Sequence, residues 1–575
     1  MQYLKKYWEK YWKPFSVSLM CLTLETGCDL MQPMIMSWIV DKGVKGKDMN
    51  YVFYFGAIML AITGFGALAA VTRNIVSSKV SQKFGAELRS DLFRKIQTFS
   101  FDNIDKFETA TLVTRLTNDV TQVQNFVHGM MRIFVKAPLI CIGSLVMATL
   151  LNPSMALVLY AIVPVIGVLI FASMRVGFPR FTRVQKALDR VNGVMREYLA
   201  GVRVVKAFNR FDYETERFHK ANSELSSVST AAMRVMAMFT PGISLVVQMG
   251  IVTVLWLGGF RVSSGQMQVG QVIAFTNYMT QILFSLMMIS FVFTMFVRAR
   301  ASSERISEVL TQDDSMPIKE PPEELTNTKG RIDFHNVFFT YADASGDPVL
   351  KDISFSCQQG ETIGIIGSTG SGKSSLVNLI PRFYDVTSGS VEVDGINVKD
   401  ADPQKLREKI AIVPQKTILF TGTIMDNIRW GSEEATPQEI ENAAEVAQAH
   451  DFISSFPEGY NTLLGQGGVN LSGGQKQRVS IARALVRKPE ILILDDCTSA
   501  VDVATESRIK KALKDYSRSL TCIIIAQRIT SVMGADRILV LDNGKITGMG
   551  NHQELLQTCQ VYKDIFRSQV GKEGM

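Results

Sequence analysis

Apolar residues in the first half of the chain gather in long stretches with few interruptions. Each stretch has about 20 residues or more, which matches the ~30 Å hydrocarbon thickness of a bilayer. The pattern predicts six membrane-spanning helices, at residues 15–40, 51–76, 133–151, 155–178, 237–259 and 272–297. An even number of spans keeps both ends of the chain on one side of the membrane.

The polar segments between these spans differ in length and charge. Segments 77–132 and 179–234 are long and basic, as is the N-terminal stretch MQYLKKYWEKYWK. The joints at 152–153 and 260–271 are short and carry little charge. Because lysine and arginine favour the cytoplasmic side, both termini are expected in the cytoplasm of a multi-pass cell-membrane protein. The loop 41–50 carries three lysines on the outer side and weakens this bias.

The two long segments have a helical period. In stretches such as SQKFGAELRSDLFRKIQ, apolar residues recur three or four positions apart, so the spans are expected to continue into the cytoplasm as helices. Residues 311–330 are proline-rich, acidic and aperiodic, which is typical of a linker. From Arg331 onward, strand, turn and helix patterns alternate. The expected fold is multi-domain: an all-α six-helix transmembrane domain (1–310), the linker (311–330) and an α/β P-loop domain (331–575).

Composition excludes several other classes of function. The first apolar stretch is too long for a cleavable signal and is expected to remain as a membrane helix. Seven cysteines, an odd number without a CxxC pair, indicate neither disulfides nor a metal site. The net charge of +7 lies mainly beside the membrane, where anionic lipid explains it better than nucleic acid does.

The segment ETIGIIGSTGSGKSSLVNLI carries the first candidate chemistry. An apolar strand leads into a glycine-rich loop and then an amphipathic helix, which is the context in which this motif binds nucleotide phosphates. Glycines let backbone N–H groups approach the phosphates, and the helix N-terminus adds further donors. Lys373 is expected to hold the β and γ phosphates of ATP, and Ser374 the Mg²⁺ ion. The predicted ATP-binding loop comprises Gly367, Ser368, Thr369, Gly370, Ser371, Gly372, Lys373, Ser374 and Ser375.

Five further motifs follow the order found in ABC transporters, and the whole chain resembles that family. FFTY ends in Tyr341, which matches the aromatic residue that stacks on adenine, and IVPQ ends in Gln415, which matches the glutamine that senses the γ phosphate and Mg²⁺. ILILD ends in Asp495, a further Mg²⁺ residue, and SAVD, with Ser499 and Asp502, matches the D-loop. The motif that matches the family signature LSGGQ comprises Leu471, Ser472, Gly473, Gly474 and Gln475.

The resemblance implies a half-transporter of the exporter type. In such proteins two chains sandwich two ATP molecules, and each site takes its P-loop from one chain and its signature from the other. The partner implied is therefore a second half-transporter chain, in addition to the lipid bilayer.

Two positions depart from the family pattern. Asp496 replaces the glutamate that acts as general base, and Gln527 occupies the place of the switch histidine. Aspartate is one methylene shorter, so its carboxylate should fall roughly 1 Å short, and such misplacement can cost about a hundredfold in rate. The double replacement resembles the degenerate half of bacterial heterodimeric multidrug exporters, in which the partner supplies the competent base. Aspartate as a tolerated substitute is the alternative.

Glu25 and Asp29 lie inside the first predicted span, four residues apart and hence on one helix face. One interpretation is that they line an inward cavity and attract cationic substrates. The other is that they bond to neighbouring helices or lie near a membrane interface. Segments 101–107 and 209–216 resemble the family's coupling helices, which transmit ATP-driven closure to the spans.

The expected function is ATP-driven export of hydrophobic or amphipathic small molecules as half of a heterodimer. A homodimeric lipid or peptide exporter and an ATP-gated channel or regulator are the alternatives.

Overall fold

The computed structural model describes residues 3–313, 315–319, 321–323, 330–341, 346–516 and 519–570. The chain forms two compact units, each considered separately below. One comprises Met1–Gln97 and Ala110–Gln312, and the other comprises Thr98–Thr109 and Asp313–Met575. Within the predicted linker 311–330, residues 314, 320 and 324–329 lie outside the described ranges.

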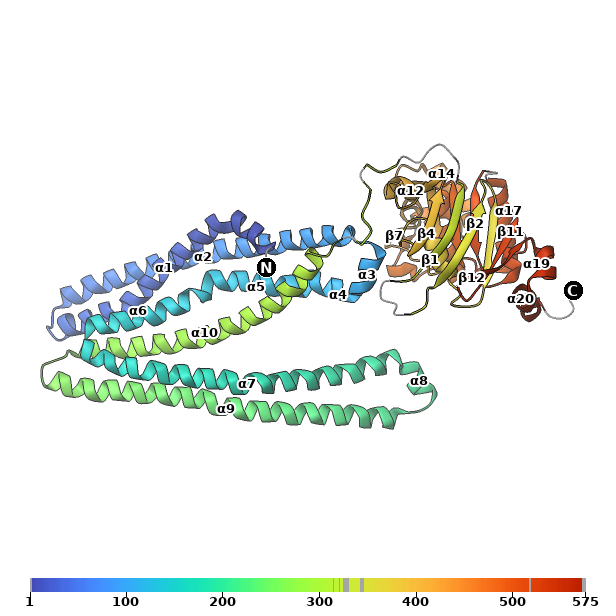
Figure 1. Cartoon of the computed structure of the whole chain (residues 1–575). Coiled ribbons are helices and arrows are strands. Elements are labelled where there is room, and N and C mark those ends of the chain that lie inside the picture. The colour runs from blue at the N-terminus through green and yellow to red at the C-terminus, as the bar shows by residue number, and fades with distance from the viewer. Residues whose placement is uncertain are drawn as a thin grey trace. The chain divides into compact units, whose positions relative to one another are not determined.

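The first unit is entirely helical (Figure 1). Its α-helices are α1 (Tyr3–Trp38), α2 (Met49–Gln97), α4 (Thr109–Thr114), α5 (Val120–Gly129), α6 (Lys136–Leu151), α7 (Pro153–Ala200), α8 (Val202–Ala207), α9 (Phe211–Ser263) and α10 (Val269–Leu310). Three π-helical turns interrupt them, namely η1 (Ile39–Val44), η2 (Arg115–Asp119) and η3 (Met130–Phe134).

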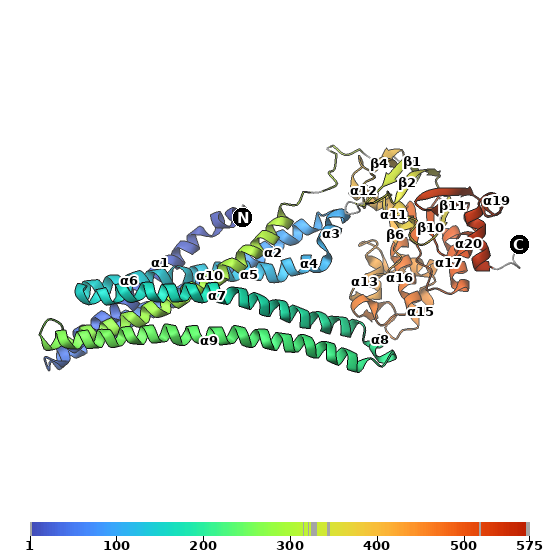
Figure 2. The ribbon, with the colours of Figure 1, turned by 60° about the horizontal axis from the view of Figure 1, so that its bottom comes forward.

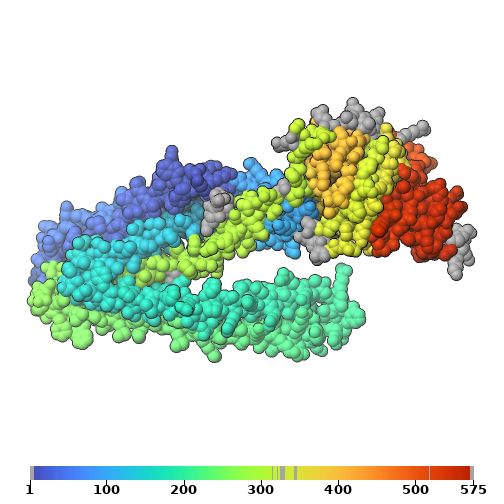
Figure 3. Space-filling view, viewed as in Figure 1, coloured from blue at the N-terminus to red at the C-terminus, as the bar shows by residue number. Residues whose placement is uncertain are grey.

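Two long antiparallel pairs organise this unit. Helices α1 and α2 form one pair, and α7 and α9 form the other, which the space-filling view shows as a continuous band (Figure 3). Helix α10 packs against α1, α6 and α9. The buried Tyr278 of α10 donates a hydrogen bond to the carbonyl oxygen of Leu30 at 2.9 Å, which ties α10 to α1.

Five helical segments in the described residues are long and apolar enough to cross a membrane. They are Met49–Gln97, Thr109–Leu151, Pro153–Ala200, Phe211–Ser263 and Val269–Leu310. Helix α1, which holds the first of the six predicted spans, has 36 residues but is absent from this set. Glu25 and Asp29 interrupt its apolar stretch and lower its hydropathy.

The short joint between α6 and α7 follows from local sequence. The Asn152 side chain accepts a hydrogen bond from the backbone N–H of Met155, and Pro153 occupies the first turn, where its missing N–H costs no helix bond. This joint lies between the third and fourth predicted spans.

The second segment that resembles a coupling helix, 209–216, does not form a separate helix. The separate short helix is α8, Val202–Ala207, which follows the end of α7 at Gly201. Asn209 adopts a positive φ of 51° and turns the chain, and Phe211 already begins α9. Asp212 and Glu214 favour that helix start, because acidic side chains stabilise the first turn.

The second unit is an α/β domain built on two larger sheets. Strands β2, β1, β4 and β5 form a four-stranded antiparallel sheet, and the six-stranded sheet has the order β12-β11-β3-β10-β9-β6. The six-stranded sheet is parallel across β11, β3, β10, β9 and β6. Strand β12 pairs antiparallel with β11 at its edge.

The strands of this unit are β1 (Ile332–Phe339), β2 (Leu350–Cys357), β3 (Thr362–Gly367), β4 (Ser388–Val393), β5 (Ile396–Asn397), β6 (Ile410–Val413), β7 (Gly422–Thr423), β8 (Leu463–Leu464), β9 (Ile491–Asp495), β10 (Thr521–Ile525), β11 (Arg537–Asp542) and β12 (Lys545–Gly550). The α-helices are α3 (Phe101–Phe107), α11 (Lys373–Asn378), α12 (Pro403–Lys409), α13 (Ile424–Arg429), α14 (Pro437–Val446), α15 (His450–Ser454), α16 (Gly473–Leu485), α17 (Val503–Tyr516), α18 (Ile529–Val532), α19 (His552–Thr558) and α20 (Gln560–Val570). The 3₁₀ turns are η4 (Gly459–Asn461) and η5 (Gln466–Gly468). Helices α13, α14 and α16 pack together, and Figure 2 shows α13 and α16 side by side.

Helix α3 comes from the first hundred or so residues but belongs to the α/β unit. The Tyr384 hydroxyl donates to a carboxylate oxygen of Asp105 at 2.8 Å, and the rings of Phe101 and Phe383 lie 4.7 Å apart. The Asn103 side-chain amide donates to the backbone oxygen of Asp313 at 3.1 Å. Polar and aromatic contacts together hold α3 in place.

We expect Tyr384→Phe to loosen α3. A hydrogen bond to a charged group contributes about 1.5–3 kcal/mol. The equilibrium constant for detachment of α3 from the α/β unit should therefore rise by roughly tenfold or more. The measurement is the rate of tryptic cleavage after Lys106 in the full chain, by peptide mass. Tyr516→Phe, which loses a bond to the Leu485 carbonyl oxygen far along the chain, is the matched control. Equal cleavage in both variants would contradict the role of this bond.

Candidate functional site

The glycine-rich loop connects β3 to α11. Gly370 and Gly372 adopt φ values of 82° and 98°, a region that strains residues with a Cβ. A Cβ on Gly372 would also lie 2.8 Å from a methyl group of Leu350. The loop therefore turns tightly into α11, whose first residue is Lys373.

A cavity of about 240 Å³ opens beside this loop. It joins the loop to side chains that follow three other strands of the parallel sheet. Its lining residues are Val349, Thr369, Gly370, Gly372, Lys373, Ser374, Ser375, Gln415, Asp495, Asp496, Ile525 and Gln527. Sequence reasoning missed Val349 and Ile525, whose only signal is their position, just before β2 and at the end of β10 respectively.

The Lys373 ammonium group lies inside the loop. It donates hydrogen bonds to the carbonyl oxygens of Gly367 at 3.0 Å and Ser368 at 2.7 Å. Burial lowers the pKa of Lys373, and the charges of Asp496 and Asp495 oppose this shift. A phosphate would give this half-buried cation an anionic partner, so the site suits a polyanionic ligand.

Ser374 and Asp495 bring two hard oxygen ligands together. The Ser374 hydroxyl donates to an Asp495 carboxylate oxygen at 3.2 Å. Burial raises the pKa of Asp495, the negative Asp496 adds to the shift, and Ser374 and Lys373 oppose it. A divalent cation would relieve this unfavourable burial of negative charge, and Mg²⁺ prefers such oxygen donors. The residues present therefore fit Mg²⁺, with Ser374 and Asp495 as ligands and Gln415 close by.

The Asp496 carboxylate is held by two amides. One of its oxygens accepts a hydrogen bond from the Gln527 side chain at 2.8 Å and another from Gln415 at 3.1 Å. Asp496 has a positive φ of 46° and is only 8% exposed. Both departures from the family pattern, Asp496 and Gln527, thus bond directly to each other.

The signature segment lies at the start of α16. The Ser472 side chain caps this helix by accepting from the backbone N–H of Gln475, and the Gln475 side chain accepts from the N–H of Ser472 at 2.8 Å. Leu471 is buried, whereas Ser472 and Gly473 are exposed. None of residues 471–475, all of which the structure describes, lines the cavity.

The D-loop links this signature helix to the cavity. The Gln477 side chain contacts the Ser499 hydroxyl at 3.4 Å and accepts from the backbone N–H of Ala500 at 3.1 Å. Ser499 in turn donates to the backbone oxygen of Asp496 at 3.1 Å. Asp502 accepts from the backbone N–H of Thr505 at 2.9 Å and so fixes the start of α17.

Tyr341 lies near the loop but outside the cavity lining. Its ring packs edge-on against Phe339 at 4.8 Å and Tyr384 at 5.2 Å, and its hydroxyl bonds to Ser375 at 2.8 Å. The ring is therefore anchored beside the phosphate loop.

Comparison with known proteins agrees with this geometry. Residues 15–287 match the ABC transporter transmembrane region and residues 350–499 match the ABC transporter domain. The ABC transporter ATP-binding protein YfiB of Bacillus subtilis is 41% identical over 567 residues, 98% of each chain. The chain belongs to the ABC transporter family.

Other relatives and a solved structure share the architecture of this ABC transporter. The ATP-dependent lipid A-core flippase of Desulfotalea psychrophila is 32% identical over 97% of each chain. The fatty acid ABC transporter ATP-binding/permease protein of Mycobacterium tuberculosis is 34% identical over 91% of this chain and 82% of its own. A bacterial Atm1-family ABC exporter with ATP bound shares the fold, with a TM-score of 0.81, 24% identity, and coverage of 97% of this chain and 99% of the other.

These comparisons confirm the expected fold class, a helical transmembrane domain followed by an α/β nucleotide-binding domain. The chain is a multi-pass membrane protein that couples ATP to transport, and its relatives include bacterial proteins. ABC exporters of this fold function as dimers in the membrane.

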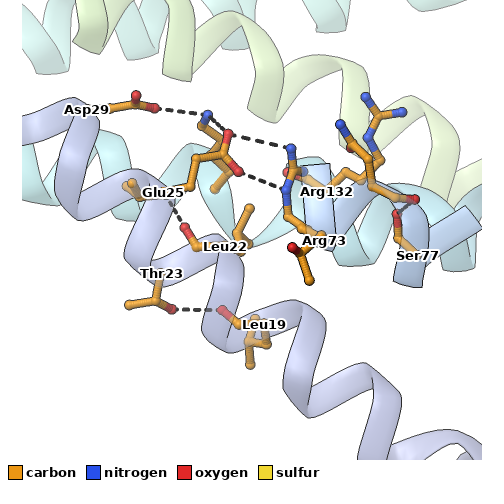
Figure 4. Close-up of polar contacts among 12 residues, drawn as sticks. Leu19, Leu22, Thr23, Glu25, Asp29, Arg73, Ser77 and Arg132 are labelled. Atoms are coloured by element: carbon orange, nitrogen blue, oxygen red, sulfur yellow. Dashed lines mark hydrogen bonds and ion pairs between the residues drawn. The ribbon is translucent and has the colours of Figure 1, made fainter. Parts of the chain in front are cut away.

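Glu25 and Asp29 are both ion-paired (Figure 4). Glu25 lies 2.8 Å from the Arg73 guanidinium and 2.6 Å from the Lys136 ammonium, and Asp29 lies 3.0 Å from Lys136. Glu25 is 7% exposed, whereas the Asp29 side chain is 37% exposed. The carboxylates are bonded to neighbouring helices, as the second sequence interpretation expected, and their charges are compensated.

We expect Lys373→Ala to abolish photolabelling of this chain by an ATP analogue, because the cavity then loses its buried cation. Lys351→Ala is the matched control, since that lysine pairs with Asp347 and does not line the cavity. Labelling that survives in the Lys373 variant would refute the phosphate-binding role.

Glu25→Gln should destabilise the protein more than Asp29→Asn. Removing one partner of a buried ion pair costs about 3–5 kcal/mol, whereas an exposed pair is worth less than about 1 kcal/mol. The measurement is the thermal midpoint of the detergent-purified chain. Glu224→Gln, which breaks an exposed pair with Arg190, is the control. A smaller loss for Glu25→Gln than for Asp29→Asn would contradict this ranking.

Proposed function

We propose that this chain is one half of a heterodimeric ABC exporter and that its own ATP site hydrolyses poorly. The observation that supports this most directly is the double hydrogen bond from Gln415 and Gln527 to one oxygen of Asp496. A general base must instead reach the water that attacks the γ phosphate.

Two physical features disfavour Asp496 as that base. Its side chain is one methylene shorter than glutamate, and two amides already bind one of its oxygens and orient the carboxylate toward Gln415 and Gln527. Gln527 can bond to a phosphate but cannot change its protonation state as a histidine can. We infer that the site binds MgATP through Lys373, Ser374 and Asp495 and turns it over slowly.

The same chain retains the parts that a partner's site needs. The signature residues 472–475 form a capped helix start at which Ser472 and Gly473 are exposed, and Gln477 connects that helix to the D-loop. In the dimer we propose, this surface covers ATP bound by the partner's P-loop, where a glutamate and a histidine complete the competent site. ATP then closes the sandwich and turns the transport pathway outward, and hydrolysis resets it.

We propose that residues 1–310 form the membrane domain, 331–575 the nucleotide domain, and 311–330 the linker between them. The basic segments 77–132 and 179–234 would lie in the cytoplasm together with both termini. Helix α3 would act as a coupling helix, since it belongs to the same compact unit as the nucleotide site.

Hydrophobic or amphipathic molecules are the proposed substrates. Glu25 and Asp29 give no reason to prefer cations, because each carboxylate already has a cationic partner. A homodimeric lipid exporter is the second candidate, because the two named relatives act on lipid A-core and on fatty acids. Mass measurement in detergent, with and without a co-expressed partner chain, separates the two assemblies.

We expect Asp496→Asn to lower ATP turnover of the heterodimer by only a small factor, because Asp496 contributes little as a base. Ser472→Arg should lower it on the order of a hundredfold, because a bulky cation at the exposed cap prevents closure over the partner's γ phosphate. The measurement is steady-state ATPase activity of the purified complex at saturating ATP.

A complex in which the partner's own catalytic glutamate is changed to glutamine serves as the inactive reference. If Asp496→Asn is as inactive as that reference while Ser472→Arg remains active, this chain is a catalytic half and the degenerate-site proposal fails.

A further inference from the structure

The ion pairs around Glu25 leave one cation of the same cluster without an anion. Glu25 pairs with Arg73 and Lys136, and Asp29 pairs with Lys136. Arg132 belongs to this cluster because its backbone oxygen accepts a hydrogen bond from Arg73 at 3.4 Å, as Figure 4 illustrates. Within the part of the chain that the structure describes, no ion pair includes Arg132. The cluster therefore carries three cations and two anions.

The Arg132 guanidinium is partly withdrawn from solvent. Its Nε atom is buried and has no hydrogen-bond partner among the described residues. A terminal nitrogen contacts the Nε2 atom of His128 at 3.0 Å, which supplies no negative charge. Arg132 also lies in η3, a π-helical turn, and such turns are frequent at functional sites. A half-buried cation without an anion is costly at the edge of a bilayer, so the cluster favours one further anion.

An apolar surface lies along the same segment. A Cβ on Gly129 would lie 3.0 Å from the Met295 methyl group, and Ser144 donates to Gln281 at 3.1 Å. Residues 281–295 of α10 therefore run beside residues 129–144, which include Arg132 and Lys136. This stretch of α10 exposes Met287, Met288, Ile289, Phe291 and Phe293. Methionine and phenylalanine side chains offer an adaptable surface for an alkyl tail.

We propose that Arg132, supported by Lys136 and Arg73, binds the anionic head group of an amphiphile, a carboxylate or phosphate on an apolar tail. Arg73 lies near the end of the predicted span 51–76, and Arg132 lies just before the predicted span 133–151. The head group therefore binds near the cytoplasmic side of the membrane. The inference rests on the export function proposed above and names its substrate class. The same chemistry is present in a resident bilayer lipid, and the experiment distinguishes the two sources.

The test uses the full chain, with its partner where one copurifies, in lipid vesicles. Three fluorescent probes share one alkyl tail and differ in the head group: a fatty acid, its methyl ester and the corresponding trimethylammonium. ATP-driven movement of each probe is measured, and photo-crosslinking of a diazirine form of the acid and of the ester reports binding separately.

We expect the acid to move about tenfold faster than the ester, since each tenfold corresponds to ~1.4 kcal/mol of preference. Arg132→Gln should remove this preference and leave the ester unchanged, and Arg132→Lys should retain most of it. Arg298→Gln, at an exposed arginine of α10, is the matched control and should change neither probe. Asp29→Asn should increase the preference for the acid, because it removes one competing negative charge.

Equal movement of acid and ester, a preference for the ammonium, or equal loss of both probes in Arg132→Gln would overturn the proposal. If the Arg132→Gln variant fails to assemble, the Asp29→Asn variant tests the proposal instead. An unchanged or weaker preference for the acid in that variant would contradict the proposal. Arg132-dependent crosslinking without ATP-driven movement of any probe would contradict export and leave a resident anionic lipid as the ligand. Movement of the probes without Arg132-dependent crosslinking would contradict the anion site and leave export standing.

Discussion

Parallel pairing of β3, β10, β9 and β6 is the constraint on which the nucleotide site depends. Their registers place Gly367, Ile525, Asp495 and Val413 at the same edge of the sheet. Because the carboxyl ends of parallel strands meet there, the residues that follow each strand converge on one cavity. The cavity is therefore lined by residues that are far apart in sequence, namely Lys373, Gln415, Asp496 and Gln527.

This convergence also explains why two replacements act together. Asp496 follows β9 and Gln527 follows β10, and these strands are direct neighbours. A short carboxylate at one position and an amide at the other form a bond of 2.8 Å. Since Gln415 bonds to the same oxygen, the three side chains form one hydrogen-bonded group. The degenerate-site proposal therefore concerns one local structure and not two separate substitutions.

In the membrane unit, contacts between distant segments of the chain compensate buried charge. A carboxylate inside an apolar helix is tolerated where cations from neighbouring helices lie within ion-pair distance, as Arg73 and Lys136 do for Glu25. The pairs link α1 to α2 and α6, so charge here contributes to helix packing. Arg132, beside the same cluster, has no such anion among the described residues and is for that reason the position where chemistry outside this chain is expected.

The sequence by itself determined the long apolar helices, the order of the ATP motifs and the α/β alternation, because these depend on local composition and spacing. It also identified Asp496 and Gln527 as departures, since each is read within its own motif. Only the tertiary structure decided what those residues contact, because Gln415, Asp496 and Gln527 meet through pairing between strands distant in the chain. The position of the short helix α8 depended on a turn at Asn209 that no periodicity signals. Likewise, two carboxylates four residues apart predict a shared helix face, but their cationic partners come from α2 and α6, and packing between helices alone decides which charges are compensated.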